Sequence, residues 1–126
     1  MGFANGIKLG NLKIFRDWGY APKYVEAMWL MLQQDIPEDY IISPGEVHSL
    51  DEFVDKVFKK FNLGIEKFVK IDKSLYRTID LEMNFGDSSK AKNKLKWNYN
   101  MSFEQLIGKL VEDEIQYINW EINNKI

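Results

Sequence analysis

Two arginines and one aspartate carry the side chains best suited to hold a small anionic ligand. Arg16 stands beside Asp17 at the end of a short apolar stretch. Arg77 precedes Asp80 by three residues. A planar guanidinium can donate two parallel hydrogen bonds to phosphate oxygens, and a carboxylate can accept hydrogen bonds from hydroxyl groups. The alternatives are a structural salt bridge from Arg16 to a nearby carboxylate and a solvated loop pair for Arg77 and Asp80.

Few other side chains offer nucleophiles or metal ligands. The chain has no cysteine, which excludes disulfides, thiolate metal sites and cysteine nucleophiles, and a single histidine excludes a histidine cluster. That histidine, His48, could in principle serve as a general base. Its position just before Ser49, which is expected to cap a helix, favours a capping or packing role. We therefore expect no metal site in this chain and assign His48 no catalytic role.

Tryptophans and lysines could also form a binding surface. A tryptophan can stack on a base, but we expect Trp29 and Trp97 to pack in the core, and the role of Trp120 stays open. The run from Lys90 to Lys96 is locally basic, and we interpret it as the solvated face of a helix. The net charge of -2 and the pI near 5.5 give no general attraction to nucleic acid or to anionic membranes.

The elements that must position these side chains can be placed from periodicity and capping signals. Helices are expected over 22–34, from Ser49 to about Phe61, from Asp87 or Ser88 to Leu95, and from Ser102 onward. Short strands are expected near Ile14, over 40–42 and over 68–71, and residues 72–86 should be mostly loop. Helix 22–34 is apolar on nearly all sides in its second half, as in an element that is buried on more than one side.

The fold class that follows is α/β: a small partial domain of about four helices and two or three short strands. We expect one domain over 1–126, with a flexible start at 1–9 and a C-terminal helix extension at 114–126. No apolar run is long enough to cross a membrane, and no signal peptide is evident. A cytoplasmic location is therefore expected, with no nucleic-acid and no membrane partner.

Three stretches of sequence resemble a known family. The first contains R-D-W-G-Y-A-P at 16–22 and Y-V-E-A-M-W-L-M-L-Q-Q at 24–34. The second contains G-E-V-H-S at 45–49 and F-V at 53–54. The third contains I-D at 71–72, Y-R at 76–77, Asp80, G-D-S-S-K-A at 86–91 and K-L-K-W at 94–97. In order and spacing they resemble the C-terminal, substrate-binding lobe of GDP-mannose 4,6-dehydratase, an extended short-chain dehydrogenase/reductase.

The resemblance implies a function and assigns roles. The family enzyme is a lyase that converts GDP-mannose to GDP-4-keto-6-deoxymannose, for deoxyhexose and GDP-fucose supply, with an NADP held by its Rossmann part. The C-terminal lobe binds GDP. By this resemblance Arg16 and Arg77 contact the diphosphate and Asp80 meets the ribose hydroxyls. The implied ligand is GDP-mannose or another nucleotide sugar.

The catalytic and cofactor motifs of the family are absent from this sequence. No tyrosine begins a Y-x-x-x-K motif, no glycine-rich fingerprint follows a strand, and Thr78 is the sole threonine. We therefore expect a truncated chain or a standalone remnant, without bound NADP, that is inactive alone. Helix 22–34 would then expose Met28 and Leu32, which predicts a homo-oligomer or a Rossmann-domain partner.

Two alternatives stay open at this stage. Asp80 stands where the dehydratases have Glu, and Asp is usual in related epimerases, so the chain could be the lobe of a different nucleotide-sugar epimerase or dehydratase. Thr78 replaces the usual Pro of the family, which predicts a looser loop. The other alternative is a non-catalytic remnant that binds a nucleotide sugar or another protein.

Overall fold

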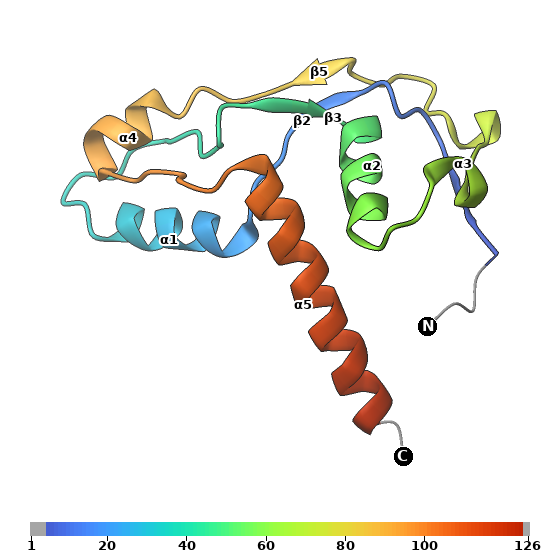
Figure 1. Cartoon of the computed structure of the whole chain (residues 1–126). Coiled ribbons are helices and arrows are strands. Elements are labelled where there is room, and N and C mark those ends of the chain that lie inside the picture. Colours follow the sequence, from blue (N-terminus) through green and yellow to red (C-terminus); the bar gives the residue numbers. More distant parts are fainter. Residues whose placement is uncertain (1–4, 125–126) are drawn as a thin grey trace.

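Short strands are interspersed with five helices in the computed structural model, which describes residues 5–124 (Figure 1). The strands are β1 (Ile7–Leu9), β2 (Phe15–Asp17), β3 (Val47–Ser49), β4 (Val69–Ile71) and β5 (Met83–Asn84). The helices are α1 (Ala21–Leu32), α2 (Leu50–Lys60), α3 (Ile65–Phe68), α4 (Ser89–Leu95) and α5 (Phe103–Asn124), with a 3-10 turn at Lys73–Leu75. The predicted α/β fold class is confirmed.

Two small sheets organise the backbone. In the first, β2 lies in the middle, antiparallel to β3 and parallel to β5, and Arg16 is opposite His48 on one side and Asn84 on the other. In the second, β1 and β4 pair in parallel. β1 therefore forms within the segment 1–9 that was expected to be a flexible start, while residues 1–4 lie outside the described residues.

The strand predictions were partly wrong. Residues 40–42 form no strand, although their apolar run favoured one. Tyr40 and Ile42 instead pack against the core formed by α1 and α4, so they contribute through side-chain burial rather than backbone pairing. β3 and the two-residue β5 were not predicted at all, because neither is long enough to show alternation. The strand expected over 68–71 is confirmed over 69–71 as β4, whereas Phe68 ends the short helix α3, which was not predicted.

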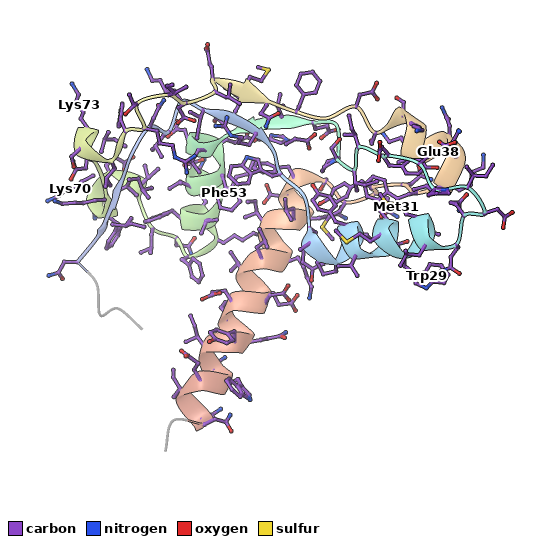
Figure 2. The ribbon with its side chains drawn as sticks, turned by 180° about the vertical axis from the view of Figure 1, so that it is seen from behind. Trp29, Met31, Glu38, Phe53, Lys70 and Lys73 are labelled. Atoms are coloured by element: carbon purple, nitrogen blue, oxygen red, sulfur yellow. The ribbon has the colours of Figure 1, made fainter. Side chains whose placement is uncertain are left out.

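The first core cluster joins α1 to α4. Its buried members are Ala27, Ala91, Leu95 and Trp97, and the indole N–H of Trp97 donates to the carbonyl oxygen of Lys23 at 3.0 Å. The predicted burial of Trp97 is thus confirmed. The prediction for Trp29 was wrong: it is 60% exposed and lies on the side of α1 away from this core (Figure 2). Two residues along a helix point to nearly opposite faces, so burial of Ala27 turns Trp29 outward.

The second core cluster joins α2 to the first turns of α5. Phe103, Leu106 and Ile107 are buried against side chains that include Phe53 and Val57 of α2 (Figure 2). Both helices begin at the predicted caps. The hydroxyl of Ser49 accepts from the backbone N–H of Glu52 at 3.0 Å, and Ser102 and Gln105 form a reciprocal capping box.

Two apolar surfaces remain outside these cores. On α1, Val25, Met28 and Leu32 are between 57% and 82% exposed, which agrees with the exposure predicted for Met28 and Leu32. The second half of α5 extends away from the rest of the chain (Figure 1). The apolar side chains of α5 therefore divide into a buried first part and a second part in which Ile115 and Ile122 are exposed.

Candidate functional site

Arg16 is held rigidly at the centre of the first sheet. Its Nη1 donates to the carbonyl oxygens of Phe15 at 2.7 Å and Leu81 at 2.8 Å. Its Nη2 donates to Oδ1 of Asp80 at 2.9 Å, and both side chains of this ion pair are about four-fifths buried. A guanidinium has five N–H donors, so three bonds leave two donors available. The arginine is thus fixed in place and keeps free hydrogen-bonding capacity.

The structure brings two of the three predicted site residues together. Arg16 and Asp80, which are 64 residues apart, form the structural salt bridge considered for Arg16. Arg77 is exposed and makes no hydrogen bond or ion pair within residues 5–124. Asp80 therefore pairs with Arg16 and not with Arg77, which is only three residues away in the sequence. Ligand contact by Arg16, Arg77 and Asp80 stays a prediction.

An open cleft of about 370 Å³ lies beside Arg16. Its lining consists of Arg16, Asp17, Tyr24, Ile41, Ile42, Ser43, Asn84, Phe85 and Gly86. The wall is therefore built by the ends of β2 and β5, the first turn of α1 and the irregular segment 41–43. One cation, one carboxylate, a phenol, a hydroxyl and an amide share this cleft with apolar side chains. Such a mixture suits a ligand that has both charged and hydroxyl groups.

Asp17 ties together two loops of this cleft. Its Oδ2 accepts from the backbone N–H of Gly45 at 3.0 Å and of Gly86 at 3.3 Å. The hydroxyl of Ser43 donates to the carbonyl oxygen of Gly86 at 2.7 Å. A Cβ on Gly86 would lie 2.7 Å from that hydroxyl oxygen, so only glycine allows this close approach. The other oxygen of Asp17, Oδ1, is buried and has no hydrogen-bond partner among the described residues.

Tyr24 supplies a neutral hydrogen-bonding group to the cleft. Burial, and secondly the negative charge of Asp17, raise the pKa of the Tyr24 phenol to about 12. The ring lies directly on Gly19, where a Cβ would meet the phenol oxygen at 1.9 Å. Tyr24, Asp17 and Ser43 were all missed as site residues. The one available signal was the position of Asp17 next to Arg16 at a strand end.

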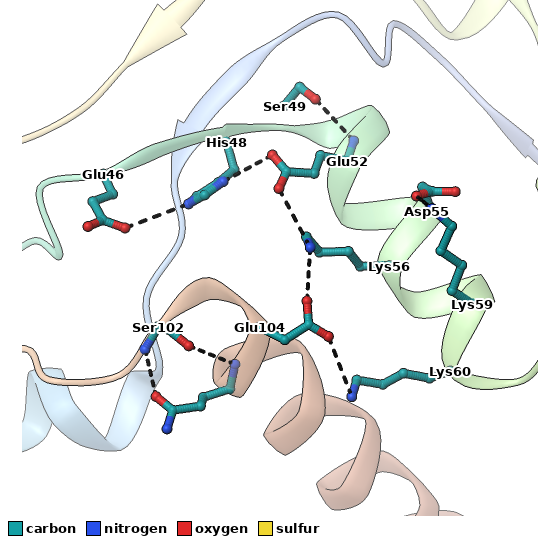
Figure 3. A network of polar contacts seen from close by, with 11 residues as sticks. Glu46, His48, Ser49, Glu52, Asp55, Lys56, Lys59, Lys60, Ser102 and Glu104 are labelled. Atoms are coloured by element: carbon teal, nitrogen blue, oxygen red, sulfur yellow. Dashed lines mark hydrogen bonds and ion pairs between the residues drawn. The ribbon is translucent and has the colours of Figure 1, made fainter.

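His48 packs, as predicted, rather than lining the cleft. Its ring stacks on Phe103 at 3.7 Å between ring centroids with 4° between the planes. Its Nδ1 lies 3.0 Å from Oε2 of Glu52, in a network that continues through Lys56 to Glu104 (Figure 3). This network joins α2 to α5. It has a structural role and shares no residue with the cleft.

The lysines of α4 form ion pairs at the surface. Lys90 and Lys94 are about half exposed and both pair with Glu38, in agreement with a solvated face of α4. Within residues 5–124, no three His, Cys, Asp or Glu side chains gather in a way that could hold a metal ion. No helix in the described part of the chain is both long and apolar enough to cross a membrane.

Comparison with known proteins identifies similar sequences. The family model described as "GDP-mannose 4,6 dehydratase" matches residues 1–110. The "GDP-mannose 4,6 dehydratase" of Dictyostelium discoideum is 43% identical over 87% of this chain, and "GDP-mannose 4,6 dehydratase 2" of Arabidopsis thaliana is 40% identical over 92%. The chain spans only 36% and 31% of the lengths of these two relatives.

Solved structures show the same fold at low sequence identity. A dTDP-glucose 4,6-dehydratase from Bacillus anthracis, solved with NAD, superposes with a TM-score of 0.76 at 18% identity, over 96% of this chain and 36% of that one. A UDP-glucose 4-epimerase from Thermotoga maritima, solved with UDP-glucose, gives 0.76 at 21% identity, over 90% and 36%. These likenesses confirm the predicted fold, that of part of an extended short-chain dehydrogenase/reductase.

Proposed function

We propose that this chain, which belongs to the GDP-mannose 4,6-dehydratase family, binds the GDP part of GDP-mannose. In this proposal the cleft beside Arg16 holds the nucleotide sugar for conversion to GDP-4-keto-6-deoxymannose. The observation that carries it is the anchored guanidinium of Arg16, which lines the cleft and keeps two unused donors. A fixed planar donor pair suits the oxygens of a diphosphate.

The other two predicted residues take complementary roles. Asp80 uses only Oδ1 for Arg16, so Oδ2 can accept from a ribose hydroxyl. Arg77 is exposed and can move to neutralise the second phosphate, because no internal partner within residues 5–124 restrains it. Asp17 positions the cleft by holding Gly45 and Gly86 together. In this proposal the two members of one ion pair therefore contact different parts of the ligand: Arg16 the phosphate and Asp80 the ribose hydroxyl.

The chemical step requires groups that we do not assign to this chain. Dehydration through a keto intermediate needs a hydride carrier, and binding residues cannot replace one. Neither a glycine-rich dinucleotide fingerprint nor a Y-x-x-x-K motif is found in residues 1–126. We therefore expect residues 1–126 alone, mixed with GDP-mannose and NADP, to form no keto sugar. Keto product in that mixture would contradict this part of the proposal.

A second candidate function rests on α1. The exposed face formed by Val25, Met28 and Leu32 favours association, with a second copy or with a Rossmann domain as the partner. We expect the isolated chain to form a dimer or larger oligomer by light scattering, and Leu32→Glu to reduce its mass to that of a monomer. A monomer at high concentration of the unsubstituted chain would count against this second candidate.

Calorimetric titration of GDP-mannose into the chain tests the binding proposal. We expect heat of binding from the parent chain and none from Arg77→Ala, because the substitution removes a proposed phosphate contact. Since Arg77 is exposed, the substitution should leave the fold intact. Lys70→Ala removes another exposed cation, on β4, and should bind as the parent does. UDP-glucose serves as the competing ligand, since equal binding would favour the lobe of a related epimerase. No heat at millimolar GDP-mannose would contradict the proposal.

A further inference from the structure

The second half of α5 carries an apolar stripe that the cores do not use. Val111, Ile115, Ile118 and Ile122 follow one another at spacings of four, three and four residues. At 3.6 residues per turn they fall within about 60° of each other around the helix. Their centre lies roughly a quarter turn around the helix from the centre of the buried face of Phe103, Leu106 and Ile107, of which Ile107 is the nearest to them. We call these four residues the α5 stripe.

The α5 stripe is separate from the nucleotide-sugar cleft. It begins at Val111, whereas the family model matches residues 1–110. Beyond that point α5 extends away from the other elements (Figure 1). Ile115 is 41% exposed and Ile122 is 59% exposed. Four branched aliphatic side chains on a projecting helix are stabilised when another surface covers them.

The spacing of the stripe indicates what kind of surface fits it. Alternation of four and three residues is the seam of a coiled coil, in which each side chain inserts between four side chains of a facing helix. β-branched side chains throughout the seam are stiff and lose little entropy when they are covered. A facing helix with its own apolar seam is therefore the best geometric match.

The charges beside the stripe indicate the chemistry of that helix. Segment 111–124 contains four acidic residues and no lysine or arginine, and the positions that flank the seam are Glu112, Glu114, Asn119 and Glu121. Glu112 pairs with Lys109 on its own helix, whereas Glu114 makes no ion pair within residues 5–124. A second copy would bring the same acidic flanks and repel, while a basic helix would be attracted.

We propose that the α5 stripe is a docking surface for an amphipathic helix of another protein that carries lysine or arginine beside an apolar seam. Apolar contact along the stripe supplies the affinity. The acidic flanks select a basic partner and exclude a second copy of this chain. The proposal is independent of nucleotide-sugar binding, because no residue of the stripe lines the cleft.

A synthetic peptide tests the proposal directly. The probe is a labelled peptide of three heptads with isoleucine in the seam and lysine on both flanks, and its control carries glutamate on the flanks. Titration of the full chain is followed by fluorescence anisotropy. We expect the basic peptide to bind at least about tenfold more tightly than the acidic one, and this preference to shrink as salt is raised.

Matched variants locate the contact. Ile118→Glu places a charge in the stripe and should weaken binding of the basic peptide at least about tenfold. Gln116→Glu adds the same charge on another side of α5 and should change binding less than about twofold. Circular dichroism verifies that both variants keep their helix. Equal binding of the two peptides, or no binding, would overturn the proposal, and so would self-association of the chain that Ile118→Glu abolishes.

Discussion

The ion pair between Arg16 and Asp80 should be worth more than an ordinary surface salt bridge. Its atoms are 2.9 Å apart and its side chains are only 24% and 20% exposed. Exposed pairs contribute about 0–1 kcal/mol, while breaking a fully buried pair costs about 3–5 kcal/mol. For Asp80→Asn, which keeps an acceptor oxygen but loses the charge, we expect a loss of about 1–2 kcal/mol in the free energy of unfolding.

Arg16→Ala should cost more than Asp80→Asn. It removes the ion pair and also the hydrogen bonds that the guanidinium donates to the carbonyl oxygens of Phe15 and Leu81. We expect a loss of about 2–4 kcal/mol in the free energy of unfolding, because the loss of these two hydrogen bonds adds to that of the ion pair. One carbonyl belongs to the first residue of β2 and the other lies two residues before β5, so the loss should loosen the wall of the cleft as well.

A double-mutant cycle measured by urea unfolding isolates the pair. The single variants, the double variant and the parent should give a coupling energy of about 1–2 kcal/mol between Arg16 and Asp80. Lys23 and Glu26 offer a matched control, because their ion pair has the same 2.9 Å distance but side-chain exposures of 31% and 51%. If the coupling of Arg16 to Asp80 did not exceed that of Lys23 to Glu26, the reasoning from burial would be refuted.

Three further predictions follow from burial, ionisation and helix capping. Trp97→Ala should lower the free energy of unfolding by about 3–5 kcal/mol, whereas Trp29→Ala, at an exposed site, should change it by less than about 0.5 kcal/mol in the same urea assay. The raised pKa of Tyr24, about 12, means that its contribution to stability is complete below pH 10 and is lost as the pH rises through 12. The pKa values of Tyr20 and Tyr99 are also raised, so ultraviolet titration should show several late tyrosines, of which Tyr24→Phe removes the one near pH 12. A titration curve that Tyr24→Phe leaves unchanged near pH 12 would contradict this. Ser102→Ala removes a capping hydroxyl and should cost about 1 kcal/mol in thermal unfolding, and an unchanged melting temperature would speak against the cap.

Local signals in the sequence identified the helices well. Ser49 and Ser102 each stand three residues before a Glu or Gln, and both cap a helix as predicted. These signals depend on side chains within one turn, so no knowledge of the rest of the fold is needed. Trp97 was also predicted correctly, as a large apolar side chain just after a helix. The family resemblance rested on long strings of residues and is confirmed by the comparisons.

Features that depend on distant residues could not be predicted. β5 has two residues and forms because it pairs with β2, almost seventy positions earlier in the chain. The apolar run at 40–42 predicted a strand, but tertiary packing determined its conformation. Asp17 was overlooked because its partners, Gly45 and Gly86, are distant loop residues. Trp29 was placed in the core because composition alone does not tell which face of α1 is covered.

The central claim is that the cleft beside Arg16 binds the GDP part of a nucleotide sugar. Its most direct test follows the backbone amide signals of four glycines by NMR while GDP is added to the chain. Gly45 and Gly86 bind Asp17 at the cleft, whereas Gly64 and Gly108 lie in α2–α3 and α5 and serve as controls. The account predicts that the signals of Gly45 and Gly86 shift and saturate together while those of the controls stay in place. Shifts confined to Gly64 or Gly108, or no shift at millimolar GDP, would contradict it.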